Sequence, residues 1–268
     1  YLINPHTSLE KILKLMVDGQ MRKALGLIPS RLNSKRLPKK STLMAGNLPL
    51  VIHTYRRAKL AKKLKDVIIC CDSQEVLNIA KKYKAKAILT SKKHKCGTDR
   101  IYEGLKKIKK NYDQIIDIQG DETLIDPRNI DNVVEFHRKH SKLDIILPNL
   151  EMSYIKDENI VKVIFNRFKE VMYLTRSDSP YNFRKRNNKM FKHLSIISFK
   201  PIALKKFATS KRGNLEEIED VELLRALEIG LKIKTFSLKG NSFSIDTPKN
   251  LKEFRKIIKF DKYYKKYL

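Results

Sequence analysis

A basic cluster in residues 28–40 is the first part of the sequence whose residue types could bind a charged ligand. The segment reads IPSRLNSKRLPKK, and its five cations directly follow an apolar run: Arg31, Lys35, Arg36, Lys39 and Lys40. Cations and backbone N–H groups on a loop at a strand end can bind the oxygens of a triphosphate. On charge alone an ordinary basic surface loop is favoured, because the whole chain is basic. The preceding strand and the two prolines that bracket the cluster make the two interpretations about equal.

Two acidic residues stand where strands are expected to end. Asp121 follows a glycine in DIQGDE at 117–122, and Asp246 precedes an expected helix in SIDTPKNL at 244–251. Carboxylate oxygens suit Mg²⁺, which takes one or two protein carboxylates and completes its shell with water and phosphate oxygens. Each acid alone is also typical of a turn or a helix cap. Two such acids facing one basic loop predict a metal–nucleotide site.

Other polar residues give weaker signals. His94 and His193 are candidates, although a single histidine is more often structural. The stretch LEEIEDVELLRALE at 215–228 is unusually acidic for so basic a chain. The sequence has no Ser-His-Asp arrangement, Walker loop or Rossmann glycine fingerprint, so covalent catalysis and dinucleotide redox chemistry are not indicated.

Alternating strands and helices are expected to position these residues. Apolar strands are predicted at 24–29, 66–72, 86–90 and 114–122, separated by amphipathic helices near 49–64, 74–83 and 98–110. Strands joined by helices of this length predict right-handed parallel crossovers and a doubly wound, mostly parallel α/β sheet. Such sheets bind ligands at the carboxyl ends of their strands, where the polar segments fall.

The remaining residues divide the chain further. Residues 145–200 contain shorter apolar strands, which predict mixed or antiparallel pairing in an inserted subdomain. One helix is expected over 216–230, strands within 233–246 and a final helix at about 248–259. Residues 7–18 have the capping-box spacing and apolar face of a helix. We therefore expect an N-terminal helical extension at 1–20 and one domain at 21–268.

The composition limits the classes of function. The 58 Lys and Arg residues against 29 Asp and Glu give +29, which raises the possibility of nucleic-acid binding. The lysines are spread over most segments without the aromatic interleaving of a base-stacking surface, so a nucleic-acid partner is not expected. No apolar run reaches the roughly 20 residues of a membrane span, and residues 1–20 lack a signal peptide pattern. With three cysteines that fit neither a disulfide framework nor a zinc site, we expect a cytoplasmic protein with no membrane partner.

At these residues the chain resembles the bacterial 3-deoxy-manno-octulosonate (Kdo) cytidylyltransferases and, more distantly, the CMP-sialic acid synthetases. The resemblance runs from residue 24 to about 257. It rests on IPSRLNSKRLP at 28–38, LPLVIHTYRRA at 48–58, HKCGTDRI at 94–101, QGDETLI at 119–125, NIVKVI at 159–164, YLTRSDSPY at 173–181, KHLSIISF at 192–199, LEEIEDVELLRALE at 215–228 and SIDTPKNL at 244–251. The 94–101 and 215–228 segments favour the Kdo branch.

The resemblance implies a nucleotidyltransferase that couples CTP to the anomeric hydroxyl of a Kdo-type sugar acid for lipopolysaccharide synthesis. It also implies Mg²⁺ as cofactor and a homodimer that contacts through residues 145–200. The implied metal ligands are Asp121 and Asp246. The residues implied to bind the nucleotide are Arg31, Ser34, Arg36, Lys40, Asp72, Gly97, Thr98 and Asp121. The residues implied to contact the sugar acid are Gln119, Arg176, Tyr181, His193, Glu219 and Glu222. The implied catalytic set is Arg31, Arg36, Lys40, Asp121 and Asp246.

Four positions depart from the family pattern. Lys39 and Ser41 replace a glycine and a proline of the phosphate loop, and Cys96 replaces a serine. Asp178 stands beside the expected sugar pocket, where an amino-substituted octulosonate is therefore conceivable. Two alternatives stay open: a sialic-type nonulosonate synthetase, and a non-catalytic relative that binds nucleotides or nucleic acid.

Overall fold

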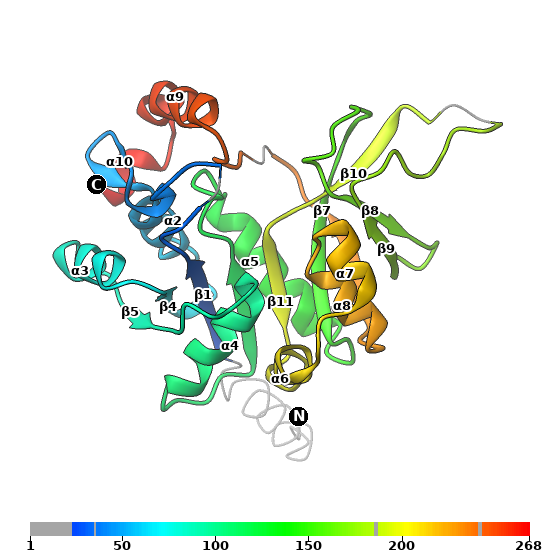
Figure 1. The fold of residues 1–268 in the computed structure, drawn as a ribbon, viewed down its shortest axis with the longest axis horizontal. Helices are drawn as coiled ribbons and strands as arrows, with labels where there is room; N and C mark the ends of the chain where they lie inside the picture. The colour runs from blue at the N-terminus through cyan, green and yellow to red at the C-terminus, as the bar shows by residue number, and fades with distance from the viewer. Residues whose placement is uncertain (1–22, 35, 185–186, 241–242) are drawn as a thin grey trace, which may run out of the picture.

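A large mixed sheet forms the centre of the computed structural model, which describes residues 23–34, 36–184, 187–240 and 243–268 (Figure 1). Within those ranges the sheet contains ten strands in the order β5-β4-β1-β6-β11-β7-β10-β8-β9, with β12 beside β7, while β2 and β3 form a separate hairpin. The strands are β1 (Ala24–Ser30), β2 (Met44–Ala45), β3 (Leu48–Pro49), β4 (Leu64–Cys71), β5 (Ala87–Leu89), β6 (Gln114–Ile118), β7 (Ile145–Ser153), β8 (Lys162–Phe165), β9 (Val171–Thr175), β10 (Lys189–His193), β11 (Ile196–Phe199) and β12 (Ile233–Ser237).

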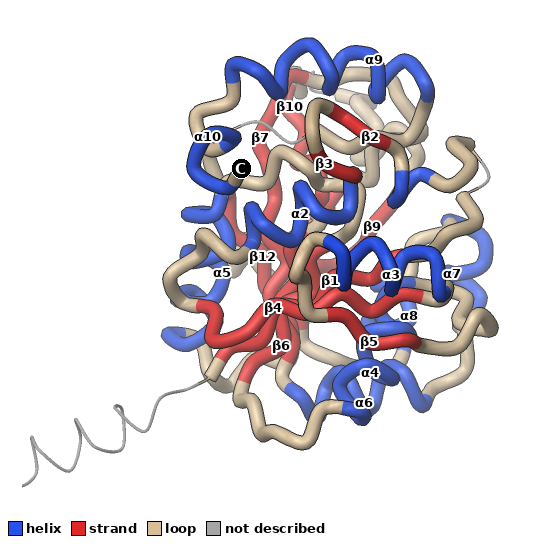
Figure 2. The backbone as a smooth tube through the Cα atoms, turned by 90° about the vertical axis from the view of Figure 1, so that its left-hand side faces the viewer, coloured by secondary structure: helices blue, strands red, loops and turns tan. Residues whose placement is uncertain are grey.

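Helices cover both faces of this sheet (Figures 1 and 2). The α-helices are α2 (Leu50–Ala58), α3 (Gln74–Lys82), α4 (Gly97–Lys107), α5 (Pro127–Lys139), α6 (Pro201–Thr209), α7 (Asn214–Glu219), α8 (Leu223–Glu228), α9 (Pro248–Ile257) and α10 (Tyr264–Tyr267). Two short 3₁₀ helices, η1 (Lys40–Thr42) and η2 (Ile258–Phe260), complete the set. One core packs α2, α5 and α9 on the sheet, and the other packs α4, α6 and α8 on the opposite face.

The first half of the chain forms the parallel part of the sheet. Strand β1 pairs in parallel with β4 and β6, and β4 pairs in parallel with β5. All seven residues of β1 are buried, as the continuous apolar run requires of a strand covered on both faces. The carboxyl ends of β1, β4 and β6 therefore meet at one edge. The predicted fold class, an α/β protein with a mostly parallel central sheet, is confirmed.

Residues 145–200 extend the same sheet with antiparallel pairing. Strand β11 runs antiparallel to β6 and β7, while β10 pairs antiparallel with β7 and β8. Strands β8 and β9 form a hairpin beyond them. The predicted mixed pairing is present, and these strands continue the central sheet. The division into domains and the dimer contact stay predictions.

Several expected elements have different bounds in the structure. The helix expected near 49–64 ends at Ala58, because Leu64 already begins β4. The single helix expected over 216–230 is two helices, α7 and α8, separated by Asp220 in a left-handed conformation (φ 49°). In the part of 233–246 that the structure describes, β12 is the only strand. Helices α5 and α6 were not predicted from the sequence. The N-terminal helix predicted at 7–18 lies outside the described residues.

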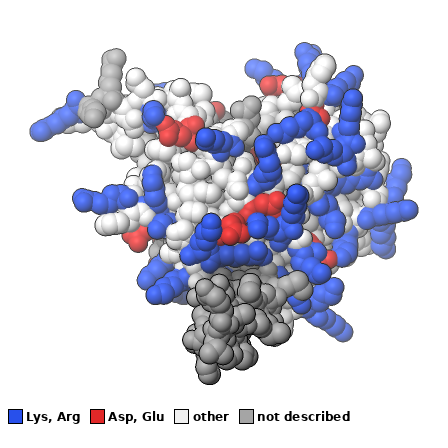
Figure 3. Space-filling model, turned by 180° about the vertical axis from the view of Figure 1, so that it is seen from behind, with Lys and Arg blue, Asp and Glu red and all other residues white. Residues whose placement is uncertain are grey.

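Basic side chains are spread widely over the surface. On the face in Figure 3 the Lys and Arg side chains extend from most of the described surface, with small groups of acids between them. This distribution agrees with the scattered lysines of the sequence. In the ranges that the structure describes, no helix has the length and apolarity needed to cross a membrane.

Candidate active site

Four charged side chains converge at the carboxyl edge of the sheet. Lys40 donates to Asp121 (Nζ–Oδ2, 2.9 Å) and to Asp246 (Nζ–Oδ1, 3.2 Å). Arg36 also donates to Asp246 (Nη2–Oδ1, 3.0 Å) and reaches Asn159 through its other terminal nitrogen (3.2 Å). The two acids are partly exposed, with 28% and 29% of their side-chain surfaces accessible. The structure thus brings together the basic loop and both acids, as the sequence predicts.

The segment that carries Asp246 is fastened to the QGDE turn by two contacts. The backbone N–H of Ile245 donates to the carbonyl of Asp121 (3.3 Å), and the Ser244 hydroxyl donates to Glu122 Oε1 (2.8 Å). Glu122 is buried beside the site, and the sequence analysis did not assign it a role. The feature of the sequence that could have indicated Glu122 is its position directly after a candidate metal ligand. Asp121 and Asp246 therefore meet because the neighbouring backbone and side chains hold them in register.

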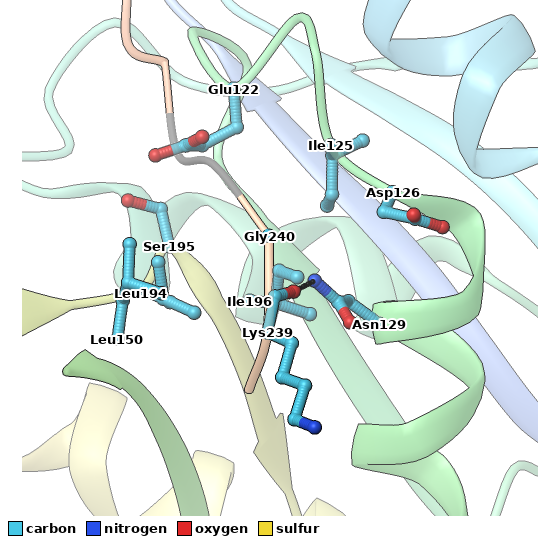
Figure 4. A pocket seen from close by; sticks show the side chains of 10 residues that line it. All are labelled: Glu122, Ile125, Asp126, Asn129, Leu150, Leu194, Ser195, Ile196, Lys239 and Gly240. Atoms are coloured by element: carbon cyan, nitrogen blue, oxygen red, sulfur yellow. Dashed lines mark hydrogen bonds between the residues drawn. The ribbon is translucent and has the colours of Figure 1, made fainter. Parts of the chain in front are cut away.

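A small cavity lies beneath this turn (Figure 4). Its volume is about 20 Å³, which is room for about one water molecule. Glu122 and Ser195 line it, and Asn129 donates to the carbonyl of Lys239 at its edge (3.1 Å). The cavity is too small for a nucleotide or a sugar, so it belongs to the support of the QGDE turn.

Asp72 holds the start of the basic loop. Its Oδ1 accepts from the backbone N–H of Leu32 (2.9 Å), and its Oδ2 accepts from Arg100 Nη2 (3.1 Å). Arg100 also donates to Thr90 Oγ1 (2.9 Å) and is almost fully buried. Asp72 was assigned to the cytidine side by resemblance, and the structure gives both its oxygens to the protein. Arg100 was not among the predicted site residues, although it lies within the segment HKCGTDRI.

The other residues of the basic loop lie further out. Arg31 is exposed and Ser34 is half-buried on the same loop, while Lys35 lies outside the described residues. Lys39 points to Glu75 (3.1 Å) rather than to the acids of the site. Its backbone is left-handed (φ 54°), a conformation that favours glycine. Lys39 is therefore an outward-facing cation at a strained position.

The convergence of Asp121 and Asp246 fits a magnesium ion. Both carboxylates approach the same ammonium group, so their oxygens face one small volume that accepts a cation. No group of three or more potential metal-ligating residues is found in the described ranges. One or two carboxylates, with water and phosphate oxygens completing the shell, is the arrangement that Mg²⁺ commonly uses.

A second group of polar side chains lies deeper at the same edge. Gln119 Nε2 donates to Asp117 Oδ2 (2.8 Å), and the backbone N–H of Thr98 donates to Glu222 Oε2 (3.1 Å). Burial raises the pKa of Asp117 well above its ordinary value, and the charge of Glu222 raises it further. Burial also raises the pKa of Glu222. Asp117 was not among the predicted site residues, although it begins the DIQGDE segment.

Gly97 permits this group to pack closely. A Cβ atom at Gly97 would lie 3.0 Å from Gln119 Nε2 and 3.3 Å from Gln119 Oε1. These distances are shorter than ordinary contacts, so a side chain here would displace the carboxamide. The structure places Gly97 against Gln119 and Thr98 against Glu222, two of the residues assigned to the sugar acid. Thr98 is itself fully buried.

A cleft of about 650 Å³ opens beside Asn159, the residue that Arg36 contacts. It is lined by Lys156, Asp157, Glu158, Asn159, Arg176, Ser177 and Asp178. A volume of this size can hold a monosaccharide acid. The four charged residues and the cleft are thus continuous through Asn159.

Arg176 lies in this cleft with its guanidinium bound to the backbone. It donates to the carbonyls of Glu219 (2.8 Å), Glu158 (3.0 Å) and Asp220 (3.2 Å). The Glu219 carboxylate accepts from Thr175 Oγ1 (2.7 Å) and from the Arg176 N–H (2.8 Å). These residues lie together as expected, and in this structure they fix the loop that carries the cleft.

The break at Asp220 separates the two acids of the acidic segment. Glu219 ends α7 and faces the Thr175–Arg176 loop, whereas Glu222 precedes α8 and faces Thr98. In the continuous helix that the sequence predicted, residues three apart would lie on one face. Two helices instead allow the two acids to reach different parts of the site.

The remaining candidates are less central. Burial and the neighbouring Lys192 lower the pKa of His193 to about 4, so it is neutral at pH 7. Tyr181 is 81% exposed and does not line the cleft in the described structure. His94 hydrogen-bonds Glu103, in agreement with a structural role.

Comparison with known proteins identifies the family. The sequence model described as "Cytidylyltransferase" matches residues 25–233. The chain belongs to the cytidylyltransferase family. It is 35% identical over 246 residues to a 3-deoxy-manno-octulosonate cytidylyltransferase of Thermodesulfovibrio yellowstonii, which covers 87% of this chain and 96% of that protein. It is also 32% identical to an 8-amino-3,8-dideoxy-manno-octulosonate cytidylyltransferase of Shewanella halifaxensis, over 84% and 94% of the two chains.

Solved structures agree with this membership. A CMP:2-keto-3-deoxy-manno-octonic acid synthetase complexed with CTP is similar with a TM-score of 0.83 and 28% identity, over 89% of this chain and 99% of that one. A protein from Bacillus anthracis described as "a Putative Glucose-1-Phosphate Thymidylyltransferase" shares the fold, with a TM-score of 0.64 and 15% identity. The match covers 87% of this chain and 94% of that one. These comparisons confirm the resemblance to the Kdo cytidylyltransferases that the sequence motifs indicate.

Proposed function

We propose that this cytidylyltransferase transfers CMP from CTP to the anomeric hydroxyl of a 3-deoxy-manno-octulosonate, as a step of lipopolysaccharide synthesis. The observation that supports the proposal most directly is the convergence of Arg36 and Lys40 with Asp121 and Asp246 beside the cleft. In the reaction the anomeric oxygen forms a bond to the α-phosphorus of CTP. The bond between that phosphorus and the bridging oxygen breaks, and pyrophosphate leaves.

The residues at the mouth of the site would act by position and charge. Arg31, Arg36 and Lys40 would bind the phosphates and stabilise the negative charge of the leaving pyrophosphate. Asp121 and Asp246 would hold Mg²⁺, which supplies neutralisation of phosphate charge when bound. Phosphoryl and nucleotidyl transfer depends mainly on such positioning, so no strong general base is required.

The deeper residues and the cleft would bind the sugar acid. Gln119 and Glu222 offer amide and carboxylate oxygens to sugar hydroxyls, and Arg176 offers a cation to the sugar carboxylate. Neutral His193 can accept or donate a hydrogen bond at the end of β10. Tyr181 would need the loop that carries it to approach the cleft.

We also propose a cytoplasmic homodimer. Support for the dimer comes from apolar side chains on the β8–β9 hairpin, where Phe168 is 65% and Met172 is 62% exposed. The three cysteines are free thiols, as a reducing compartment favours. Sedimentation of wild type and of Met172→Lys tests the dimer: a monomeric wild type contradicts it.

The reaction itself is tested with CTP, Mg²⁺ and a panel of Kdo, 8-amino-Kdo and N-acetylneuraminate, following pyrophosphate release. We expect release with an octulosonate and its loss in EDTA. Release with N-acetylneuraminate alone favours the nonulosonate alternative. No release with any sugar, together with salt-sensitive RNA binding, supports a non-catalytic relative.

One observation favours an amino-substituted sugar as a second candidate substrate. Asp178 lines the cleft together with Asp157 and Glu158, so acids outnumber the two bases, Lys156 and Arg176. An ammonium group on the sugar would be attracted to this wall. We expect Asp178→Asn to lower kcat/KM for 8-amino-Kdo about 5- to 20-fold relative to Kdo. An equal effect on both sugars contradicts this candidate.

A further inference from the structure

Asp117 is a fully buried acid directly beneath the proposed sugar-acid side of the site. It lies on β6, with its side chain on the face of the sheet covered by α4 and α8. Its exposed fraction is 0%, and Gln119 Nε2 donates to its Oδ2 at 2.8 Å. The charged groups that act on it are Glu222 and Asp121, which are both acidic. An acid in such surroundings is costly to ionise.

Glu222 is the second acid of this buried group. Its Oε2 accepts from the backbone N–H of Thr98, and its surroundings include the Cys96 thiol and the acidic Asp99. Across the sheet the buried Cys70 thiol on β4 also faces Asp117. The pKa values of Asp117 and Glu222 are both raised, chiefly by burial. Burial and acidic neighbours therefore favour the protonated form of both carboxyls.

We propose that Asp117 is a positioning residue that, through Oδ2, fixes the carboxamide of Gln119 for the sugar acid. The proposal rests on the proposed function, in which Gln119 contacts the sugar. Asp117 touches neither the sugar nor the nucleotide in this arrangement. It acts on the reaction through Gln119.

The geometry explains why one orientation of Gln119 is selected. Asp117 Oδ2 is an acceptor, so the amide nitrogen of Gln119 turns toward it and Oε1 points elsewhere. The close approach of Gly97 to both terminal atoms restricts the carboxamide from swinging aside. Oε1 is then an acceptor of fixed direction for a sugar hydroxyl. If both carboxyls ionise at high pH, their repulsion disturbs this arrangement.

Two substitutions separate the hydrogen-bonding role from the volume of the side chain. Asp117→Asn matches a protonated carboxyl, with one acceptor for Gln119 and an N–H in place of the O–H. Asp117→Leu keeps a similar volume and removes the acceptor. Steady-state pyrophosphate release at pH 7.5 should give Asp117→Asn a sugar-acid KM within about 3-fold of wild type. Asp117→Leu should raise that KM about 10- to 100-fold with the CTP KM little changed, as loss of a buried hydrogen bond predicts.

The pH dependence provides a readout that a purely structural role would not change. The sugar-acid KM of wild type should increase at alkaline pH, whereas that of Asp117→Asn should not. Because Asp117 is neutral when folded and ionises near pH 3.8 when unfolded, wild-type stability should fall as pH rises above 3.8. The melting temperature of Asp117→Asn should therefore equal or exceed that of wild type at pH 8, with the difference shrinking toward pH 4.

Two results would overturn the proposal. The first is an Asp117→Asn enzyme as impaired as Asp117→Leu, which would mean that an ionised carboxylate is required. The second is an unchanged sugar-acid KM in a folded Asp117→Leu enzyme. If wild type releases no pyrophosphate with any sugar, the proposed function fails and the positioning role with it. The melting curves still decide whether Asp117 holds a proton.

Discussion

Two pairs of acids lie at the same edge of the sheet in opposite surroundings. Asp121 and Asp246 are partly exposed, and both accept hydrogen bonds from Lys40. Asp117 and Glu222 lie deeper, and the charges that act on Asp117 are acidic. The outer pair meets at a cation, the ammonium group of Lys40. In the inner pair, burial raises the pKa of both acids and so favours their protonated forms.

A third buried acid shows what a cation changes. Burial alone would raise the pKa of Glu216, but hydrogen bonds and charge from Arg225, and from Arg212, lower it. Arg225 is 2% exposed and also pairs with Asp99 (2.9 Å), so it joins α8 to α4. Burial by itself therefore does not decide the protonation of an acid here. The presence of a buried cation does.

The largest expected effect comes from removing that cation. Arg225→Met should lower the free energy of unfolding by about 3–5 kcal/mol, because it leaves the buried Glu216 with only the partly exposed Arg212 as its cation. The loss should be measured by urea unfolding monitored by circular dichroism. The matched variant Arg212→Met, at a side chain that is 33% exposed, should cost far less. Equal losses would contradict the contrast between paired and unpaired buried acids.

The next effect concerns the outer acids. Asp121→Asn should reduce kcat about 10²- to 10³-fold, because it removes one of two carboxylates proposed to hold Mg²⁺. Pyrophosphate release at saturating CTP and sugar acid measures the change. Glu253→Gln, at an exposed acid on α9, is the control and should leave kcat unchanged. Near-full activity of Asp121→Asn would refute the metal assignment.

Two adjacent lysines distinguish the phosphate side of the site from its surroundings. Lys40→Met should reduce kcat/KM for CTP about 10- to 100-fold, because Lys40 points to both acids. Lys39→Met should change it less than about 3-fold, since Lys39 pairs with Glu75 at the outer surface. If the two variants behave alike, total loop charge matters rather than the position of Lys40.

The smallest expected effect distinguishes the loss of stability at acidic pH from the loss of stability at alkaline pH. Burial would raise the pKa of Glu103, but hydrogen bonds from Lys107, from the Ser91 N–H and from His94 lower it to about 2. Its stabilisation is therefore complete above pH 4.5 and is lost as pH falls toward 2. Glu103→Gln should make the melting temperature depend less on pH between about 2 and 4.5. Asp117→Asn should change the melting temperature at higher pH. A Glu103→Gln protein that keeps the wild-type loss of stability at acidic pH would contradict this assignment.

Part of the site could be predicted from the sequence, because the ends of the strands can be predicted. The apolar run of β1 and the polar residues after β1 and β6 place Lys40 and Asp121 at one edge by topology alone. The partners of Asp72 were not readable, because its contact with Arg100 depends on how α4 packs. The role of Asp117 could not be predicted, because the sequence does not show whether an acid within an apolar strand is protonated.

The errors in the fold also have local physical causes. The acidic segment has helical periodicity on both sides of Asp220, so a single left-handed residue within it was not predicted. Helix α5 did carry a start signal, since Asp126 caps it and Pro127 stands at its first position. The different contacts of Glu219 and Glu222 follow from the break between α7 and α8, which only the structure shows.

The route by which Asp246 reaches Asp121 has a consequence for synthesis of the protein on the ribosome. Chains are made from the N-terminus, and the strands up to β12 precede residue 246. A nascent chain can therefore pair much of its central sheet while the second carboxylate is still within the exit tunnel. Ile245 and Ser244 then dock against Asp121 and Glu122 late in translation. The protein is thus expected to pair much of its central sheet before Asp246 reaches Asp121 and before α9 packs on the core.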